Sequence, residues 1–338
     1  MKNILVLTIL FASFISCKKT STPVATPSPV SPSSPSSSNA WVQMNSFTNI
    51  NSLINIGTDL FLATSNHGMY KSIDNGSTWS STNNGLGSDT LNCEIFSNGS
   101  NLYLSTWKGL PLVNKIFQST NNGSSWTQIW NIASIGSSIN KISFFGSNIL
   151  IATAGNSYKS SNNGVSWTQI STNTTSILSF ISDGTNIFCC DPANIHKSID
   201  NGSTFTQLVN DSLNSKDFAR AASIGTDIYV GSTTGSGIYK SSNSGLTWSP
   251  VNNGLLAYYG TNLKYYITSL YSDGTNLYAG TGISKVLIST NAGISWSLLG
   301  GVMPGSSSGN NYNIKTLLVN NGYTYAIASS KGLFRILN

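Results

Sequence analysis

A short stretch that recurs along most of this chain constrains its fold more than any other feature. The first clear copy is Lys71-Ser72-Ile73-Asp74-Asn75-Gly76-Ser77-Thr78-Trp79. The shared pattern is Ser, any residue, Asp or Asn, any residue, Gly, any residue, Ser or Thr, and then an aromatic residue. Six copies occur at intervals of 38 to 48 residues, and their Asp or Asn positions are Asp74, Asn121, Asn162, Asp200, Asn243 and Asn291. A period of this length indicates a solenoid or a propeller.

The sequence between two copies predicts a four-stranded antiparallel unit. In the second repeat we expect strands at 91–96, 102–106, 115–119 and 125–129, with a hairpin turn at Asn98-Gly99-Ser100-Asn101. Gly and Asn in such turns supply the positive φ that tight hairpins need. Both faces of the second strand are apolar, as in Leu102-Tyr103-Leu104, so each sheet must pack between two others. Only 8% of the residues are charged and 31 are Gly, which agrees with short strands joined by turns.

A count of the repeats gives the number of sheets. The aromatic residue of the fourth strand occurs seven times, at Trp41, Trp79, Trp126, Trp167, Phe205, Trp248 and Trp296. The repeating region opens with an isolated fourth strand at Trp41-Val42-Gln43-Met44 and ends with an isolated third strand at 334–338. We therefore predict an all-β, seven-bladed β-propeller of four-stranded antiparallel blades over residues 41–338. Pairing of the N-terminal strand with the C-terminal strands would close it and leave no unpaired edge.

The first 40 residues predict export and a membrane anchor. Lys2 precedes an apolar run from Ile4 to Ile15 that is too short to span a bilayer, so residues 1–16 are read as a signal peptide. Ser16-Cys17 resembles the lipobox of bacterial lipoproteins, which implies lipidation of Cys17; an ordinary secretory peptide with an incidental Cys is the alternative. Residues 17–40 are rich in Pro, Ser and Thr and predict a disordered tether. We expect an outer membrane lipoprotein that faces the periplasm or the cell surface.

Charge, cysteines and histidines argue against several kinds of site. The 17 basic and 11 acidic residues form no basic cluster or stripe, so we expect no nucleic-acid partner. Cys93, Cys189 and Cys190 give neither a disulfide framework nor a paired metal motif. His67 and His196 lack a third ligand-like partner. We expect no metal, no cofactor and a monomer.

The recurring stretch resembles the Asp-box of the sialidase-type (BNR) propellers. That resemblance implies a turn between the third and fourth strands, on the face away from the active site, and so a structural role for the six Asp or Asn positions. Sialidases of this family hold the substrate carboxylate with three Arg beside a Tyr nucleophile. This chain has only Arg220 and Arg335, and a single Glu, Glu94. The catalytic residues of sialidases are therefore not matched.

Two other propeller families are similar and imply different functions. Xyloglucanase-like glycoside hydrolases use two carboxylates, which must lie about 5 to 9.5 Å apart across the bond. Photosystem II assembly-factor propellers bind protein through an Arg-rich patch that this chain lacks. The carboxylates outside the turns and boxes are Asp89, Glu94, Asp191, Asp211 and Asp217, and Asp191 also suits an Asp-Pro turn. We expect a non-catalytic propeller that binds a glycan or an envelope protein; the alternative is a glycoside hydrolase of the sialidase/xyloglucanase-like type.

Aromatic and polar residues in the loops opposite the boxes are the candidate ligand site. Aromatic faces beside Asn, Ser and Lys suit sugar rings, and a protein-binding hot spot would look similar. The alternative is that these aromatic residues pack against their own loops. The predicted ligand-binding residues are Trp107, Lys108, Trp130, Arg220, Tyr258, Tyr259, Lys264 and Tyr312.

Overall fold

The computed structural model describes the repeating region with short gaps. The described residues are 40–44, 47, 49–109, 113–132, 139–153, 155–170, 177–208, 213, 217–255, 266–306 and 311–338. Residues 39–338 form one compact unit. The predicted signal peptide, Cys17 and the tether up to residue 39 lie outside the described residues. Within the described ranges, no helix has the length and apolar character needed to cross a membrane.

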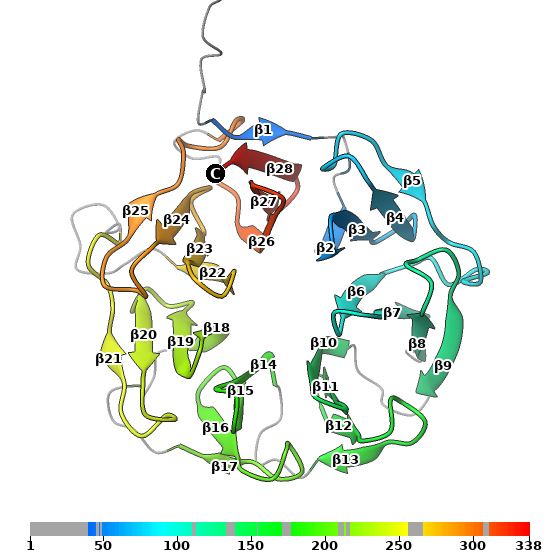
Figure 1. Cartoon of the computed structure of the whole chain (residues 1–338), viewed down its shortest axis with the longest axis horizontal. Coiled ribbons are helices and arrows are strands. Elements are labelled where there is room, and N and C mark those ends of the chain that lie inside the picture. The colour runs from blue at the N-terminus through cyan, green and yellow to red at the C-terminus, as the bar shows by residue number, and fades with distance from the viewer. Residues whose placement is uncertain are drawn as a thin grey trace, which may run out of the picture. The chain divides into compact units, whose positions relative to one another are not determined.

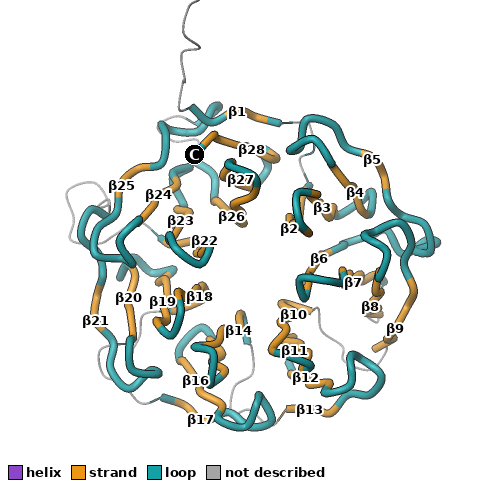
Figure 2. Tube along the Cα trace, viewed as in Figure 1, coloured by secondary structure: helices purple, strands orange, loops and turns teal. Residues whose placement is uncertain are grey.

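Seven four-stranded antiparallel sheets follow one another around a ring, which confirms the predicted seven-bladed β-propeller (Figure 1). Within the described ranges the chain is drawn as strands and loops alone (Figure 2). Blades 1 to 3 comprise β2 (Ile50–Ile56), β3 (Asp59–Thr64), β4 (Met69–Ser72), β5 (Ser80–Ser81), β6 (Glu94–Ser97), β7 (Leu102–Lys108), β8 (Val113–Ser119), β9 (Thr127–Ile132), β10 (Ile139–Phe145), β11 (Asn148–Thr153), β12 (Ser157–Ser160) and β13 (Thr168–Ile170). Blades 4 to 6 comprise β14 (Ser179–Ser182), β15 (Ile187–Cys190), β16 (Ile195–Ser198), β17 (Thr206–Gln207), β18 (Phe218–Ile224), β19 (Asp227–Ser232), β20 (Ile238–Ser241), β21 (Ser249–Pro250), β22 (Ile267–Ser272), β23 (Leu277–Thr281), β24 (Val286–Ser289) and β25 (Ser297–Leu298).

The seventh blade joins the two ends of the repeating region. It consists of β26 (Ile314–Asn320), β27 (Tyr323–Ala328), β28 (Gly332–Leu337) and, from the start of the domain, β1 (Val42–Gln43). Val42 pairs with Arg335 and Gln43 with Phe334. The Trp41 indole adds a 3.1 Å hydrogen bond to the carbonyl of Leu299 in the neighbouring blade. The predicted closure is therefore confirmed, and it gives the seventh blade the same four strands as the other six.

The hydrophobic core lies between blades. We label the four strands of a blade A to D, from the innermost to the outermost (Figure 1). The five residues from Leu60 to Thr64 in strand B of blade 1 are all buried, as the two-sided apolar pattern predicts. Phe61 of blade 1 packs in one cluster with Leu102, Leu104 and Trp126 of blade 2. Each sheet is thus held by its two neighbours rather than by a single central core.

The repeated turns between strands C and D are built by their Asp or Asn side chains. Asp74 Oδ1 accepts the backbone N–H of Thr78 at 2.9 Å, and its Oδ2 accepts the Thr78 hydroxyl at 2.6 Å. Asn121 accepts the N–H of Ser125 at 3.0 Å and donates its amide to the Ser125 hydroxyl at 2.8 Å. The hydroxyl reverses its role, so the amide and the carboxylate give the same turn.

The turns also define the two faces of the ring. Asn122, in the C–D turn of blade 2, donates to Asp59 in the A–B hairpin of blade 1 at 2.8 Å. Ser244 of blade 5 likewise donates to Asp183 of blade 4 at 2.7 Å. The A–B hairpins and the C–D turns therefore share one face, which we call the turn face. The B–C and D–A connections lie on the opposite face, which we call the loop face.

Candidate functional site: the central channel

The strand A of every blade contributes to a central channel. This channel has a volume of about 870 Å³ and is lined by residues of β2, β6, β10, β14, β18, β22 and β26 or of the segments just before them. In Figure 1 these strands surround the centre of the ring. Its size lies within the roughly 300–1,000 Å³ that small-molecule sites usually occupy. The channel is therefore large enough to hold a small-molecule or oligosaccharide ligand.

Backbone pairing places one polar residue from each blade at the same depth in this channel. These residues face the strand B positions Ala63, Ser105, Ala152, Cys190, Gly231, Gly280 and Ile327. We call them the polar ring, and they are Ser52, Glu94, Lys141, Ser179, Arg220, Ser269 and Thr316. The ring lies near the start of the A strands, so it belongs to the loop-face end of the channel. Apolar side chains that are only partly buried, among them Ile54, Ile181 and Leu270, also line the channel.

Hydrogen bonds between neighbouring blades fix the wall beside the polar ring. Asn51 donates to the carbonyl of Cys93 at 3.0 Å, and Asn140 donates to the carbonyl of Ile177 at 3.1 Å. Arg220 Nε donates to the carbonyl of Thr268 at 2.6 Å. Asn51 and Asn140 are each the extra residue of a β-bulge in strand A, and the bulge turns their side chains away from the ladder toward the next blade. The wall is therefore preorganised before any ligand arrives.

Small residues behind the polar ring let the blades approach closely. A Cβ placed on Gly231 would lie 2.7 Å from Cγ2 of Ile267, the first residue of the next strand A. Such a contact is too short to be tolerated without a shift of the backbone. Gly231 therefore brings the wall of blade 6 against blade 5, next to Arg220.

The charges that line the channel are one carboxylate and three cations. They are Glu94 and, from three other blades, Lys141, Arg220 and Lys315. Burial in the wall raises the pKa of Glu94 to about 7, although the ammonium groups of Lys141 and Lys315 oppose this rise. The surrounding protein limits the hydration of Lys141 and Arg220 and lowers the pKa of both. Among the described residues of the lining, basic side chains therefore outnumber acidic ones by three to one.

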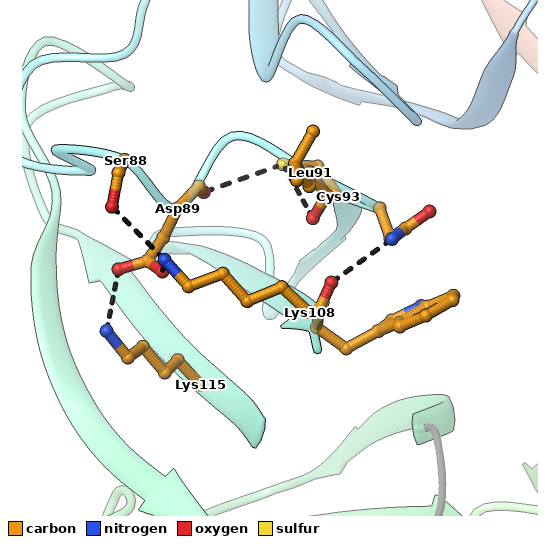
Figure 3. A network of polar contacts seen from close by, with 8 residues as sticks. Ser88, Asp89, Leu91, Cys93, Lys108 and Lys115 are labelled. Carbon is orange, nitrogen blue, oxygen red and sulfur yellow. Dashed lines mark hydrogen bonds and ion pairs between the residues drawn. The ribbon is translucent and has the colours of Figure 1, made fainter. Parts of the chain in front are cut away.

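Two of the predicted ligand residues, Trp107 and Lys108, lie at the end of β7 and do not line the channel. Lys108 Nζ lies 3.0 Å from Asp89 Oδ1, and Lys115 Nζ lies 2.7 Å from Asp89 Oδ2 (Figure 3). Lys108 is thus engaged with Asp89. Trp107 remains 38% exposed and is an accessible aromatic surface on the loop face.

Two others, Trp130 and Tyr312, pack against neighbouring parts of the fold. The ring of Trp130 stacks on Trp167 with centroids 4.2 Å apart and planes 10° apart. Tyr312 is 6% exposed, and its hydroxyl donates to the carbonyl of Pro304 at 2.9 Å. The structure therefore brings neither residue to the channel with Arg220. Tyr258, Tyr259 and Lys264 lie outside the described residues.

The candidate catalytic carboxylates are not brought together in the channel. Asp191 is 6% exposed; it accepts the N–H groups of Ala193 and Asn194 at 2.7 and 2.6 Å and contacts His196 Nε2 at 2.8 Å. It therefore organises a buried turn. Asp89 is paired with two lysines, and Asp211 lies outside the described residues. Among the described carboxylates, Glu94 alone lines the channel. The described residues likewise contain no group of three His, Cys, Asp or Glu that could hold a metal.

Comparisons with known proteins show the fold and little else. The chain matches no protein-family model and no curated protein. Among solved structures it is similar to YCF48 bound to a D1 peptide, with a TM-score of 0.66 and 14% identity over 90% of this chain and 99% of the other. It is also similar to a GH74 xyloglucanase from Xanthomonas campestris (TM-score 0.66, 11% identity) and to the GH74 enzyme of Niastella koreensis (TM-score 0.66, 18% identity). The match covers 88% of this chain but only 53% of each GH74 chain. At these identities the likeness is one of fold.

Proposed function

We propose that this protein is a non-catalytic binding propeller of the bacterial cell envelope, with a carbohydrate or a protein as its ligand. The observation that carries the proposal is the channel lining, in which one carboxylate stands among three cations. Glycoside hydrolysis needs a second carboxylate across the scissile bond. Polar groups beside apolar side chains are instead what a binding site requires.

The structural neighbours support a binding role for a propeller of this kind, but they do not identify the ligand. YCF48 is a propeller solved with a D1 peptide, and the Xanthomonas campestris neighbour is a xyloglucanase, so polypeptide and polysaccharide ligands both occur among them. Trp107, exposed on the loop face, would extend the site beyond the channel. Loss of binding in Trp107→Ala on a glycan array would place it in the site, whereas unchanged binding would remove it.

An activity assay tests the non-catalytic proposal. The full-length chain, purified in detergent, is offered fluorogenic glycosides and polysaccharides, and we expect no turnover. Turnover that Glu94→Gln or Asp217→Asn abolishes would establish the hydrolase alternative. Asp191→Asn needs a parallel unfolding measurement, because Asp191 supports a buried turn and its loss would also weaken the fold.

The lipid anchor is part of the same proposal and has its own test. Lipidation of Cys17 followed by a Pro-rich tether would hold the propeller at the outer membrane, on its periplasmic or outer side. We expect the wild-type chain in the membrane fraction and a Cys17→Ala variant in the soluble fraction. Retention of Cys17→Ala in the membrane would contradict the anchor. Protease treatment of intact cells would then show which side the propeller faces.

A further inference from the structure

We propose that the channel binds the carboxylate of an acidic oligosaccharide, such as a uronate, between Lys141 and Arg220 of the polar ring and Lys315, the residue before Thr316. This inference rests on the proposed binding function and names its ligand class. The three cations belong to blades 3, 5 and 7, so they approach the channel from different sides of the ring. A ligand in the middle of the channel would therefore interact electrostatically with all three basic side chains.

The lysines of the channel are not paired with carboxylates in the way that lysines elsewhere on this protein are. On the turn face Lys71 and Lys240 each meet an Asp of an A–B hairpin, at 2.8 and 2.6 Å. By contrast, neither Lys141 nor Lys315 has a carboxylate within ion-pair distance in the described part of the chain. Both side chains line the channel and have solvent-accessible surface. Ammonium groups only donate hydrogen bonds, so the complementary ligand group is an anionic acceptor.

The other lining residues favour a sugar as the carrier of that anion. Asn51, Asn140 and Asn313, with Ser52 and Thr316, surround the cations with groups that both donate and accept. Sugar hydroxyls also do both. The lining also includes Ile54, Ile181 and Leu270, which are only partly buried and present an apolar surface that suits the C–H face of a pyranose ring.

The test compares an acidic sugar with its own neutral form. Titration calorimetry of the full-length chain in detergent uses trigalacturonate, its trimethyl ester and a mannuronate trisaccharide, with triglutamate as a peptide of equal charge. We expect a uronate to bind at least about tenfold more tightly than the trimethyl ester, as one or more charge-assisted hydrogen bonds would give. Lys141→Ala and Lys315→Ala should each weaken uronate binding about tenfold. Lys71→Ala and Lys240→Ala, which remove the same charge on the turn face, should not.

The outcomes separate this inference from the function on which it rests. The inference would be overturned if trigalacturonate and its ester bound with equal affinity, or if Lys141→Ala and Lys315→Ala left the affinity for uronate unchanged. The proposed binding function would still stand. If neither uronate binds, or if triglutamate binds instead of them, an acidic saccharide is not the ligand. Release of new reducing ends from a uronate would instead contradict the non-catalytic function and leave the site in place.

Discussion

Arg335 in the last strand donates from Nη1 to the backbone carbonyl of Asn75, in the first repeated turn, at 2.6 Å. The two residues are 260 positions apart, and the bond joins blade 7 to blade 1. The guanidinium also lies 4.7 Å from the ring centre of Tyr323, and the Tyr325 hydroxyl donates to the same carbonyl at 3.2 Å. One of the two arginines of this chain thus supports closure of the ring, while Arg220 lines the channel.

Arg335→Ala should lower the free energy of unfolding by about 2 kcal/mol, because it removes a charged hydrogen bond and a cation–π contact across the closure. Arg335→Lys should lose part of this amount, since an ammonium group cannot stack on Tyr323 in the way a planar guanidinium does. Chemical unfolding of the full-length variants measures both. Lys285→Ala is the control and should change stability by less than about 0.5 kcal/mol. A stability of Arg335→Ala equal to that of the control would show that closure does not depend on this contact.

The sequence predicted the propeller and its blade count because both follow from local, repeated signals. Each repeated turn carries its own Asp or Asn, Gly and aromatic residue, and these need no distant partner to be recognised. The seventh blade was predictable because the orphan strand at Trp41 supplies the strand that the chain end at Phe334 lacks. The contact between Arg335 and Asn75 was not predictable, because it depends on how closely two blades approach.

The channel lining was not singled out from the sequence, because unusual residues were sought in the loops rather than in the repeating strands. Trp130 stands out in the sequence, yet it stacks on Trp167 of the next repeat. Glu94, Lys141 and Lys315 were missed as a group, since each lies in a strand that looks ordinary alone. An alignment of the A strands would have shown a recurring pair of polar positions after the first apolar residue, as in Asn51-Ser52, Asn140-Lys141 and Lys315-Thr316. That these polar positions of different blades meet in one channel follows only from closure of the ring.

Gly85 and Gly99 form a matched pair that separates backbone strain from crowding. Their φ angles are +91° and +90°, but a Cβ on Gly99 meets nothing within 4 Å, whereas one on Gly85 would collide with the backbone carbonyl of Trp126 in the next blade. Gly99→Ala should cost about 1–2 kcal/mol of unfolding free energy for the left-handed backbone alone. Gly85→Ala should cost about 2 kcal/mol more, because the blades must move apart. Equal costs in chemical unfolding would mean that the Gly85 contact is easily relaxed.

The three cysteines of the propeller should be unreactive in the folded protein. Cys93, Cys189 and Cys190 are free and buried. Burial raises the pKa of Cys93 and of Cys190 to about 12 and raises that of Cys189 as well, so almost no thiolate forms at pH 8. With a Cys17→Ala chain, we expect a disulfide reagent such as DTNB to titrate no thiol under native conditions and all three in denaturant. Rapid native reaction would contradict the burial, and a single thiol in denaturant would reveal a disulfide between the two neighbours.

Glu94 should make uronate binding weaken as the pH rises through about 7. Its carboxyl faces the charges of Lys141 on β10 and Lys315 on β26, and Arg220 lies on β18 in the same wall. Below this pH the protonated group leaves the three cations uncompensated, whereas above it the carboxylate offsets one of them. Glu94→Gln should keep the low-pH affinity at pH 8. Parallel pH profiles of the two proteins in calorimetry would show that Glu94 does not influence the site.

The same group should reduce the stability of the fold at high pH. The folded pKa of Glu94 is about 7, above its ordinary value of 4.5, so the folded state holds the proton more tightly than the unfolded state does. Unfolding free energy should therefore fall between pH 4.5 and 7 and then level off, relative to Glu94→Gln, which has no proton to lose. Asp227→Asn is a control of opposite sign: pairing with Lys240 lowers the pKa of Asp227, so its contribution is present above about pH 4 and is lost as the pH falls. Stability curves in urea across this range measure both differences. A Glu94→Gln curve parallel to that of the wild type would mean that the channel hydrates Glu94 as freely as bulk water does.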